Sequence, residues 1–387
     1  MTQARFTPLR ERHESLGASF TDFGGWQMPV RYTSDLAEHH AVRQAAGLFD
    51  ISHMAEFLVA GAAAAAYLDY ALAGRLSTMK VGKAKYSLLL AETGGIIDDV
   101  IVYRLAEDRF LIISNAGNRD AVADALSARS LSDLEAKRNA QPDAASFGFP
   151  GGSVTVEDVS DAYALLAIQG PASEQIVAAV EGITDVSVAW GEQKYYSWAS
   201  ARYNGEPLLV ARTGYTGEDG FELLVRAEDA AALWDAALAA GEAHGLVAAG
   251  LAARDTLRLE AGMPLYGNEL SLDTKPAQAG LGRVVASDKD DFVGKDAPAP
   301  AEGARVLVGL AAEGRRAGRA GYAVVAEDGT ALGEITSGVL SPTLGHPIAM
   351  AYIDPAYADA GTTVYLDVRG TKIPATVTAL PFYRRKK

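Results

Sequence analysis

The chain has 387 residues, of which 49% are hydrophobic and 22% charged, a balance typical of soluble globular proteins with two or three domains. A formal net charge of −14 disfavours a nucleic-acid-binding protein, and the lack of cysteine excludes disulfides, thiolate-bound zinc and iron–sulfur clusters. No apolar run reaches the roughly 18 residues of a membrane-spanning helix, and the first eleven residues lack the apolar core of a signal peptide. We therefore expect a cytoplasmic protein with neither a membrane nor a nucleic-acid partner.

The first part of the chain alternates helix and strand signals. A helix is expected at 34–46, because Ser34 is a good N-cap and Gly47 a good stop. Further on, the pattern predicts strands at 56–59, 86–90, 99–104 and 110–114 and helices at 60–73 and 119–130. This is a mixed α+β pattern with hairpin-like strand pairs. Residues 139–152 are rich in Pro, Gly, Asn and Ala, which is typical of an exposed loop.

The second part begins with another α+β block, from residue 154 to about 285. The pattern predicts helices near 172–181, 227–241 and 250–261 and strands around 163–168, 208–212 and 221–225. Residues 286–304 are dense in Asp, Lys, Pro and Ala, which is typical of a linker. Beyond them only short strands are expected, separated by turn signals such as Asp328-Gly329 and Arg369-Gly370. This end of the chain therefore indicates a small antiparallel barrel or sandwich.

Two adjacent carboxylates are the most informative local feature. Asp98 and Asp99 follow the turn Gly94-Gly95 and lead into an apolar strand. Because adjacent side chains of a strand point to opposite faces, one of the two must face inward if the other faces solvent. An inward carboxylate is costly unless it has a charge partner, hydrogen bonds or a functional task. A turn with a solvated acidic pair is the alternative, and this segment alone does not decide between them.

An ordered set of motifs is more specific than the acidic pair alone. The motifs are DFGGWQMP at 22–29, FDISHM at 49–54, IQGP at 168–171, RTGYTGEDGFE at 212–222, GLAARD at 250–255, GEITSG at 333–338, SPTLG at 341–345 and PFYR at 381–384. Each motif is weak alone, but together, in this order from end to end, they resemble the T-protein of the glycine cleavage system, an aminomethyltransferase family.

The resemblance implies an α+β fold of three domains in a cloverleaf around a central folate channel. Residues 1–54 and 154–285 would form a discontinuous folate-binding domain, and 55–150 an inserted α+β domain that carries Asp99. After the linker, 305–387 would form a C-terminal antiparallel β-barrel or jelly-roll-like domain. Sequence pattern alone does not show the discontinuity.

The resemblance also implies the activity. An aminomethyltransferase moves the methylene carbon of the aminomethyl group, carried on the dihydrolipoyl arm of the H-protein, to tetrahydrofolate. The products are 5,10-methylenetetrahydrofolate and ammonia. The alternatives are another tetrahydrofolate-dependent one-carbon transferase or demethylase of the same fold, or a non-catalytic folate-binding chaperone. We expect tetrahydrofolate as co-substrate, the lipoylated H-protein as partner, and a monomer.

Site residues follow from the same resemblance, position by position. Asp99, the second acid of its motif, is the expected catalytic residue, which polarises a folate amine and stabilises developing positive charge. Glu222 is expected to accept two pterin N–H groups in a bidentate fork. Arg254 and Arg384 would contact folate or substrate. Further folate contacts are expected from Tyr86, Tyr103, Tyr215, Asn115 and Leu58, although tyrosine is also a common strand residue that packs without a ligand.

Several neighbouring residues are given other roles. Arg258 is expected to be structural and Arg385, with the two lysines after it, a solvated tail. Ala55 stands where the family usually has glycine, so its methyl group is expected to narrow the channel. No metal is expected, because the only adjacent histidines, His39 and His40, would point about 100° apart on a helix and make a poor ligand pair.

Overall fold

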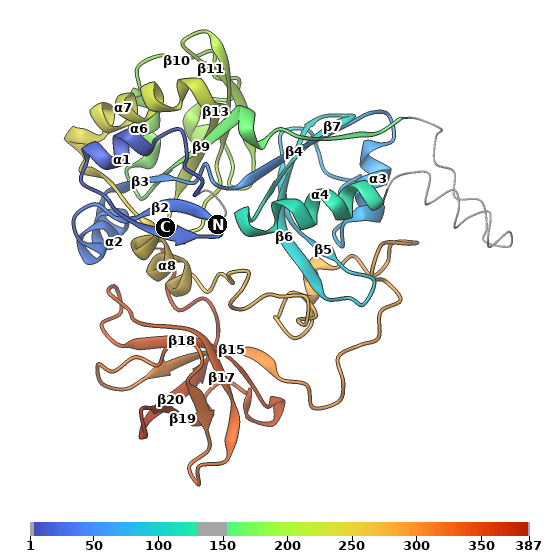
Figure 1. Ribbon diagram of the computed structural model, residues 1–387, viewed down its shortest axis with the longest axis vertical. Coiled ribbons are helices and arrows are strands. Elements are labelled where there is room, and N and C mark those ends of the chain that lie inside the picture. Colours follow the sequence, from blue (N-terminus) through green and yellow to red (C-terminus); the bar gives the residue numbers. More distant parts are fainter. Residues whose placement is uncertain (1–3, 130–152, 386–387) are drawn as a thin grey trace, which may run out of the picture.

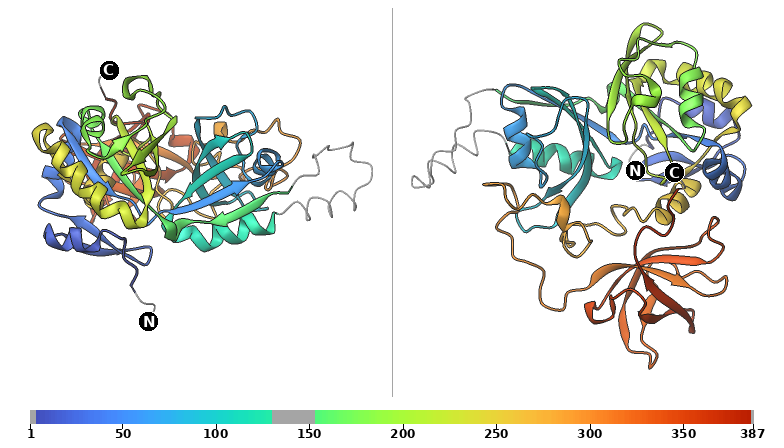
Figure 2. Two further views of the ribbon diagram at one scale, coloured as in Figure 1. Left: turned by 90° about the horizontal axis from the view of Figure 1, so that it is seen from above. Right: turned by 180° about the vertical axis from the view of Figure 1, so that it is seen from behind.

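The computed structural model describes residues 4–129 and 153–385, and the loop expected at 139–152 lies outside them. Three lobes surround a common centre, two built on open sheets and one on a barrel (Figures 1 and 2). Helix α8 (Leu251–Glu260) lies near the middle, between the first sheet and the barrel (Figure 1). The expected α+β fold of three lobes with a C-terminal barrel is confirmed.

The first lobe contains a seven-stranded sheet in the order β10-β11-β12-β13-β9-β3-β14. The strands are β3 (Ala46–Asp50), β9 (Tyr163–Gln169), β10 (Ile183–Thr184), β11 (Trp198–Tyr203), β12 (Glu206–Ala211), β13 (Gly220–Arg226) and β14 (Leu246–Ala248). β3 pairs antiparallel with β9 and parallel with β14, so residues from both sides of the segment 55–150 share this sheet. Helices α1 (Arg10–Ser15), α6 (Ser173–Ala179) and α7 (Ala230–Gly241) cover one face through an apolar core around Trp234.

The N-terminal segment also supplies a hairpin and a helix. The hairpin pairs β1 (Ser19–Phe23) with β2 (Trp26–Arg31), and α2 (Asp35–Gln44) follows it. The Ser34 hydroxyl accepts a hydrogen bond from the Ala37 amide, as expected of an N-cap. The expected helix stop at Gly47 is wrong, because Gly47 lies inside β3. A Cβ there would come within 2.5 Å of Val42 Cγ2, so glycine is needed for close packing between α2 and β3.

The second lobe is a five-stranded sheet in the order β5-β6-β7-β4-β8. Its strands are β4 (Ala55–Ala60), β5 (Ala84–Leu90), β6 (Ile96–Ala106), β7 (Arg109–Ser114) and β8 (Thr155–Asp158). Because β8 pairs with β4, this sheet also draws on residues that follow the segment 130–152. Helices α3 (Ala64–Ala71) and α4 (Arg119–Ala128) cover one face, and Val100 and Val102 of β6 are buried beneath them.

The other face of β6 meets the first lobe. Tyr103 belongs to a buried apolar cluster that also contains Leu111 of β7, Phe49 of β3 and Leu257 of α8. Side chains alternate along a strand, so Asp99, which is two positions from Ile101, points to this inter-lobe face, whereas Asp98 points towards α4. The contact between the two lobes therefore sets where Asp99 lies.

The third lobe is a closed antiparallel barrel in the order β15-β18-β17-β16-β19-β20. The strands are β15 (Val306–Ala312), β16 (Ala323–Val325), β17 (Ala331–Leu340), β18 (Pro347–Ile353), β19 (Thr363–Val368) and β20 (Thr371–Thr378). Both turn signals lie between paired strands. Arg369 and Gly370 have φ values of +54° and +82° in the two-residue loop from β19 to β20, where a hairpin needs positive φ.

The segment 286–304, expected as a linker, is attached to the second lobe. The Lys289 ammonium is buried and donates to the carbonyl oxygens of Asp69, Leu72 and Gly74, at the C-terminal end of α3. A cation is favourable there because the last carbonyls of a helix carry partial negative charge. Burial lowers the pKa of Lys289 to about 8. The route to the barrel is therefore fixed along much of its length.

Candidate functional site

Asp99 lies on β6 and is held by two donors. Its Oδ1 accepts a hydrogen bond from Asn115 Nδ2 at 2.8 Å, and its Oδ2 accepts one from the Tyr86 hydroxyl at 3.1 Å. Tyr86 is on the adjacent strand β5, and Asn115 follows directly after β7. Three neighbouring strands thus place these expected site residues together. Both donors orient the carboxylate without an ion pair.

Asp98 is also buried, which the sequence argument did not anticipate. Its side chain is fully buried on the α4 face, where it accepts hydrogen bonds from Asn115 N at 2.9 Å, Asn115 Nδ2 at 2.8 Å and Asn118 Nδ2 at 2.6 Å. Neither member of the pair is a solvated turn residue. Asp98 therefore secures Asn115, the residue that in turn holds Asp99.

Burial changes the acidity of both carboxyl groups. The pKa of Asp98 is raised by burial and by the neighbouring negative charge of Asp99. Burial also raises the pKa of Asp99, and the hydrogen bonds from Tyr86 and Asn115 and the positive charge of Arg254 only partly offset it. A carboxylate with a raised pKa is a better proton acceptor than one in water.

Glu222 lies on β13 of the first lobe and faces the second lobe. Its Oε2 accepts hydrogen bonds from the Thr213 hydroxyl and from the Tyr103 hydroxyl, the latter at 3.4 Å. Burial raises the pKa of Glu222, with the Thr213 hydrogen bond and the charge of Arg254 acting against it. Within the described ranges, the hydrogen bonds to Glu222 reach Oε2, which leaves Oε1 to accept from a ligand.

Arg254 on α8 is the cation of this group. Its guanidinium carbon lies 4.6 Å from the ring centroid of Tyr215, a cation–π contact. Its charge favours the ionised forms of both Asp99 and Glu222. The Tyr215 hydroxyl donates to the Pro264 carbonyl oxygen, which fixes the ring. One arginine therefore offsets two half-buried carboxylates that come from different lobes.

Two residues of this region were missed as site residues. His53 is 1% exposed, and neither ring nitrogen has a hydrogen-bond partner among the described residues. Burial and the charge of Arg254 lower the pKa of His53 to about 3, so its imidazole is neutral at pH 7. Tyr196 is held at φ +57°, a conformation rare for an aromatic residue, and burial, with smaller contributions from the charges of Glu222 and Asp99, raises its pKa. The FDISHM motif could have indicated His53, whereas no sequence signal marked Tyr196.

Three other expectations meet a different geometry. The Arg384 side chain is exposed, and it is Arg385 that pairs with Asp219 at 3.2 Å. The expectation that Arg385 is solvated is therefore wrong. Ala55 is fully buried among the apolar residues under α3, so its methyl group points away from the inter-lobe face and the expected narrowing is wrong. Leu58 is half-buried on β4 opposite Leu111, on the inter-lobe face.

The structure also bears on the expectations for Arg258, for metal binding and for membrane-spanning helices. Arg258 is structural, as expected: it is 1% exposed and its Nη1 lies 2.8 Å from Glu269 Oε2. Over residues 4–129 and 153–385, no group of three or more His, Asp or Glu side chains has the arrangement of a metal site. In the same ranges, no helix has both the length and the apolarity to cross a membrane.

Comparisons with known proteins cover the whole chain. Residues 9–289 match the family model of the GCVT N-terminal domain, and 305–384 match that of the glycine cleavage T-protein C-terminal barrel domain. The aminomethyltransferase of Cutibacterium acnes is 54% identical over 391 residues, with all of both chains covered, and that of Streptomyces coelicolor is 52% identical, with 100% and 99% covered. The crystal structure of the glycine cleavage system aminomethyltransferase T from Bartonella henselae superposes with a TM-score of 0.85 at 36% identity, over 100% of each chain.

Proposed function

Because the chain belongs to the T-protein family of the glycine cleavage system and is a tetrahydrofolate-dependent aminomethyltransferase, we propose that the Asp99–Glu222–Arg254 group is its reaction site. The observation that carries the proposal is the convergence of two partly buried carboxylates and one arginine from β6, β13 and α8. Withdrawing carboxylates from water is costly, so a cluster of this kind needs a task.

The proposed chemistry starts at the carbon between sulfur and nitrogen on the dihydrolipoyl arm. The carbon–nitrogen bond breaks and ammonia leaves, so the carbon, still bonded to sulfur, becomes thiocarbenium-like and electron-poor. The folate amines N5 and N10 form the two new bonds to this carbon, and the carbon–sulfur bond breaks to return the thiol. The two folate N–H protons balance the equation, since one goes to ammonia and one to sulfur.

Asp99 is proposed to assist at the folate amine. Its raised pKa makes it a proton acceptor for the amine, and its negative charge stabilises positive charge that develops on the transferred carbon. Tyr86 and Asn115 hold the carboxylate in one orientation before substrate arrives. This preorganisation removes the cost of reorienting the group during reaction.

Glu222 is proposed to bind the pterin. A carboxylate accepts N–H donors strongly because its charge assists each hydrogen bond. The hydroxyl groups of Thr213 and Tyr103 already donate hydrogen bonds to Oε2. Oε1 is therefore the atom proposed to accept a hydrogen bond from the pterin amino group. The flat rings of Tyr215 and Tyr86 would then lie against the ligand, and Arg254 and Arg384 are proposed to meet its carboxylates or the substrate arm.

The test is a complete assay with the partner protein. Aminomethylated, lipoylated H-protein and tetrahydrofolate should give ammonia and 5,10-methylenetetrahydrofolate in equal amounts. A panel of methylated donors, assayed in parallel, separates this reaction from that of a demethylase of the same fold. Folate binding without turnover of any donor would indicate the chaperone instead. Sedimentation of the chain alone and with the H-protein tests the proposal that it acts as a monomer.

A further inference from the structure

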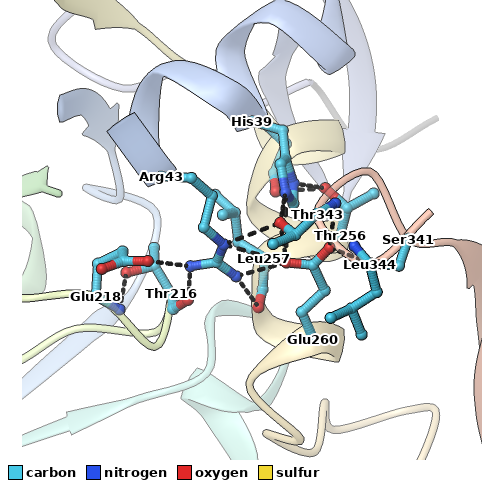
Figure 3. Close-up of polar contacts among 11 residues, drawn as sticks. His39, Arg43, Thr216, Glu218, Thr256, Leu257, Glu260, Ser341, Thr343 and Leu344 are labelled. Atoms are coloured by element: carbon cyan, nitrogen blue, oxygen red, sulfur yellow. Dashed lines mark hydrogen bonds and ion pairs between the residues drawn. The ribbon is translucent and has the colours of Figure 1, made fainter. Parts of the chain in front are cut away.

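We propose that Arg43 is a positioning residue for folate binding, because it fastens the loop of Tyr215 to α8, the barrel and the C-terminal segment. The inference rests on the proposed folate site. The contacts form the Arg43 junction, which we define as His39, Arg43, Glu218, Glu260 and Thr343 (Figure 3). None of these residues was expected to take part in the function.

Arg43 directs its guanidinium at four separate segments. Nη1 donates to Thr216 O at 2.7 Å and to Glu218 Oε1 at 2.9 Å. Nη2 donates to Glu260 Oε2 at 2.8 Å and to Leu257 O at 3.4 Å, and Nε to the same carboxylate oxygen at 3.1 Å and to Thr343 Oγ1 at 3.3 Å. The side chain is 5% exposed. A lysine keeps the charge but has a single nitrogen, so it cannot reproduce this fork.

Glu260 joins Arg43 to the barrel loop within the Arg43 junction. This carboxylate is fully buried and accepts hydrogen bonds from the Ser341 hydroxyl, from Thr343 N at 3.0 Å and from Thr343 Oγ1 at 2.7 Å. His39 Nε2 lies 3.4 Å from Glu260 Oε2, and its Nδ1 is bonded to Thr256 Oγ1 at 2.7 Å. Figure 3 shows α2, α8 and the barrel loop that follows β17 meeting at these side chains.

Two of the segments held at the junction lead directly to a proposed ligand contact. Thr216 follows Tyr215, whose ring stacks on Arg254, and the same loop enters β13 towards Glu222. The ring of Tyr383 lies 4.1 Å from the Arg43 guanidinium carbon, directly before Arg384. Among the described residues, no hydrogen bond or ion pair joins the Arg43 side chain to an expected site residue. Its influence on binding must therefore pass through the segments that it fixes.

A structural role alone would predict a different outcome. A buried arginine that only stabilises the fold would change the amount of folded enzyme and leave the kinetic constants of the folded fraction unchanged. A positioning residue changes affinity in the folded fraction, because a displacement of about 1 Å in a contact residue can cost up to a hundredfold. The decisive variable is the KM for tetrahydrofolate, compared with kcat.

The principal variant is Arg43→Lys, and Arg129→Lys is its matched control. Arg129 is likewise buried and donates to the carbonyl oxygens of Ala71 and Leu90, in the second lobe. Both variants are assayed by steady-state kinetics with saturating aminomethylated H-protein and by urea unfolding. We expect Arg43→Lys to raise the KM for tetrahydrofolate by about tenfold, with kcat per folded molecule within about twofold. Arg129→Lys should lose stability with an unchanged KM.

The outcomes separate this inference from the proposed function. An unchanged KM in folded Arg43→Lys, or the same rise in Arg129→Lys, overturns the positioning role. If Arg43→Lys fails to fold, Glu218→Gln decides, because it weakens the contacts of Glu218 with Arg43 Nη1 and with Tyr383 and leaves those of Glu260 intact. It should raise KM in the same direction by a smaller factor. A wild-type enzyme that does not turn over tetrahydrofolate contradicts the proposed function instead, whatever the variants do.

Discussion

Replacing Asp99 with asparagine removes one charge and keeps the shape of the side chain. Two unit charges 4 Å apart interact by about 4 kcal/mol at an effective dielectric constant near 20, and about half of that is expected when only part of the charge has developed. A loss of about 2–3 kcal/mol corresponds to a fall in turnover of roughly a hundredfold. Folate affinity should change little, because the pterin contact is proposed at Glu222.

The assay measures turnover and binding separately. Single-turnover release of ammonia from aminomethylated H-protein gives the chemical step, and calorimetric titration with tetrahydrofolate gives affinity. Turnover in Asp99→Asn above a tenth of the wild-type value, with affinity preserved, would refute the electrostatic role. A loss of affinity equal to the loss of turnover would show instead that Asp99 acts in binding.

Asp98→Asn is the companion variant, and the structure changes what is expected of it. A solvent-facing Asp98, which the strand alternation alone allows, would tolerate this substitution. In the structure the Asp98 carboxylate accepts three hydrogen bonds from Asn115 and Asn118, and an amide cannot accept all three. Hydrogen bonds to a charged group contribute about 1.5–3 kcal/mol each, partly offset because the buried charge is gone. We expect a loss of about 3 kcal/mol in urea unfolding, and wild-type stability would contradict this account.

Three further predictions concern the other parts of the site. Glu222→Ala should weaken tetrahydrofolate binding ten- to a hundredfold by calorimetry, at about 1.5–3 kcal/mol for lost hydrogen bonds to a charged group, and unchanged affinity would remove Glu222 from the site. Arg384→Ala should lower activity without changing the unfolding curve, since its side chain is exposed, whereas wild-type activity in this variant would assign Arg384 to the tail. Burial alone would raise the pKa of Glu260, but the hydrogen bond and charge of His39 and the other junction contacts lower it to about 2. The stabilisation that ionised Glu260 gives to the fold is therefore present above about pH 4.3 and is lost as the pH falls towards 2. Glu260→Gln should make the free energy of unfolding less dependent on pH in this range and lower it by on the order of 3 kcal/mol at pH 7.

Local signals predicted the elements well where one residue type decides the backbone. Ser34 caps α2, and Arg369-Gly370 turns the chain between β19 and β20. The signal failed at Gly47, where glycine serves a contact between α2 and β3 that is non-local in the fold. Glycine has the same appearance in sequence whether it ends a helix or admits a neighbouring side chain.

The motifs predicted site residues that lie within them, but not residues whose role depends on contacts between distant segments. Asp99, Glu222, Arg254 and Tyr215 come together at the inter-lobe face, and their individual roles stay predictions. Arg43 could not be found from sequence, because the hydrogen-bond partners of its side chain lie between 173 and 300 residues away along the chain. Such a junction exists only after the first lobe and the barrel have assembled.

Strand β6 explains why neighbouring residues of one motif have unlike roles. One face of the strand carries Asp98, Val100 and Val102 into the core beneath α4, and the other carries Asp99 and Tyr103 towards the first lobe. Because the side-chain period of a strand is two, a register shift of one residue would exchange the two sets. The apolar residues of both faces resist that exchange, so they also determine which carboxylate reaches the inter-lobe face. The choice of Asp99 over Asp98 therefore has a physical basis in Val100 and Val102, independent of the family motif, since moving either valine to the other face would leave the α4 core unfilled.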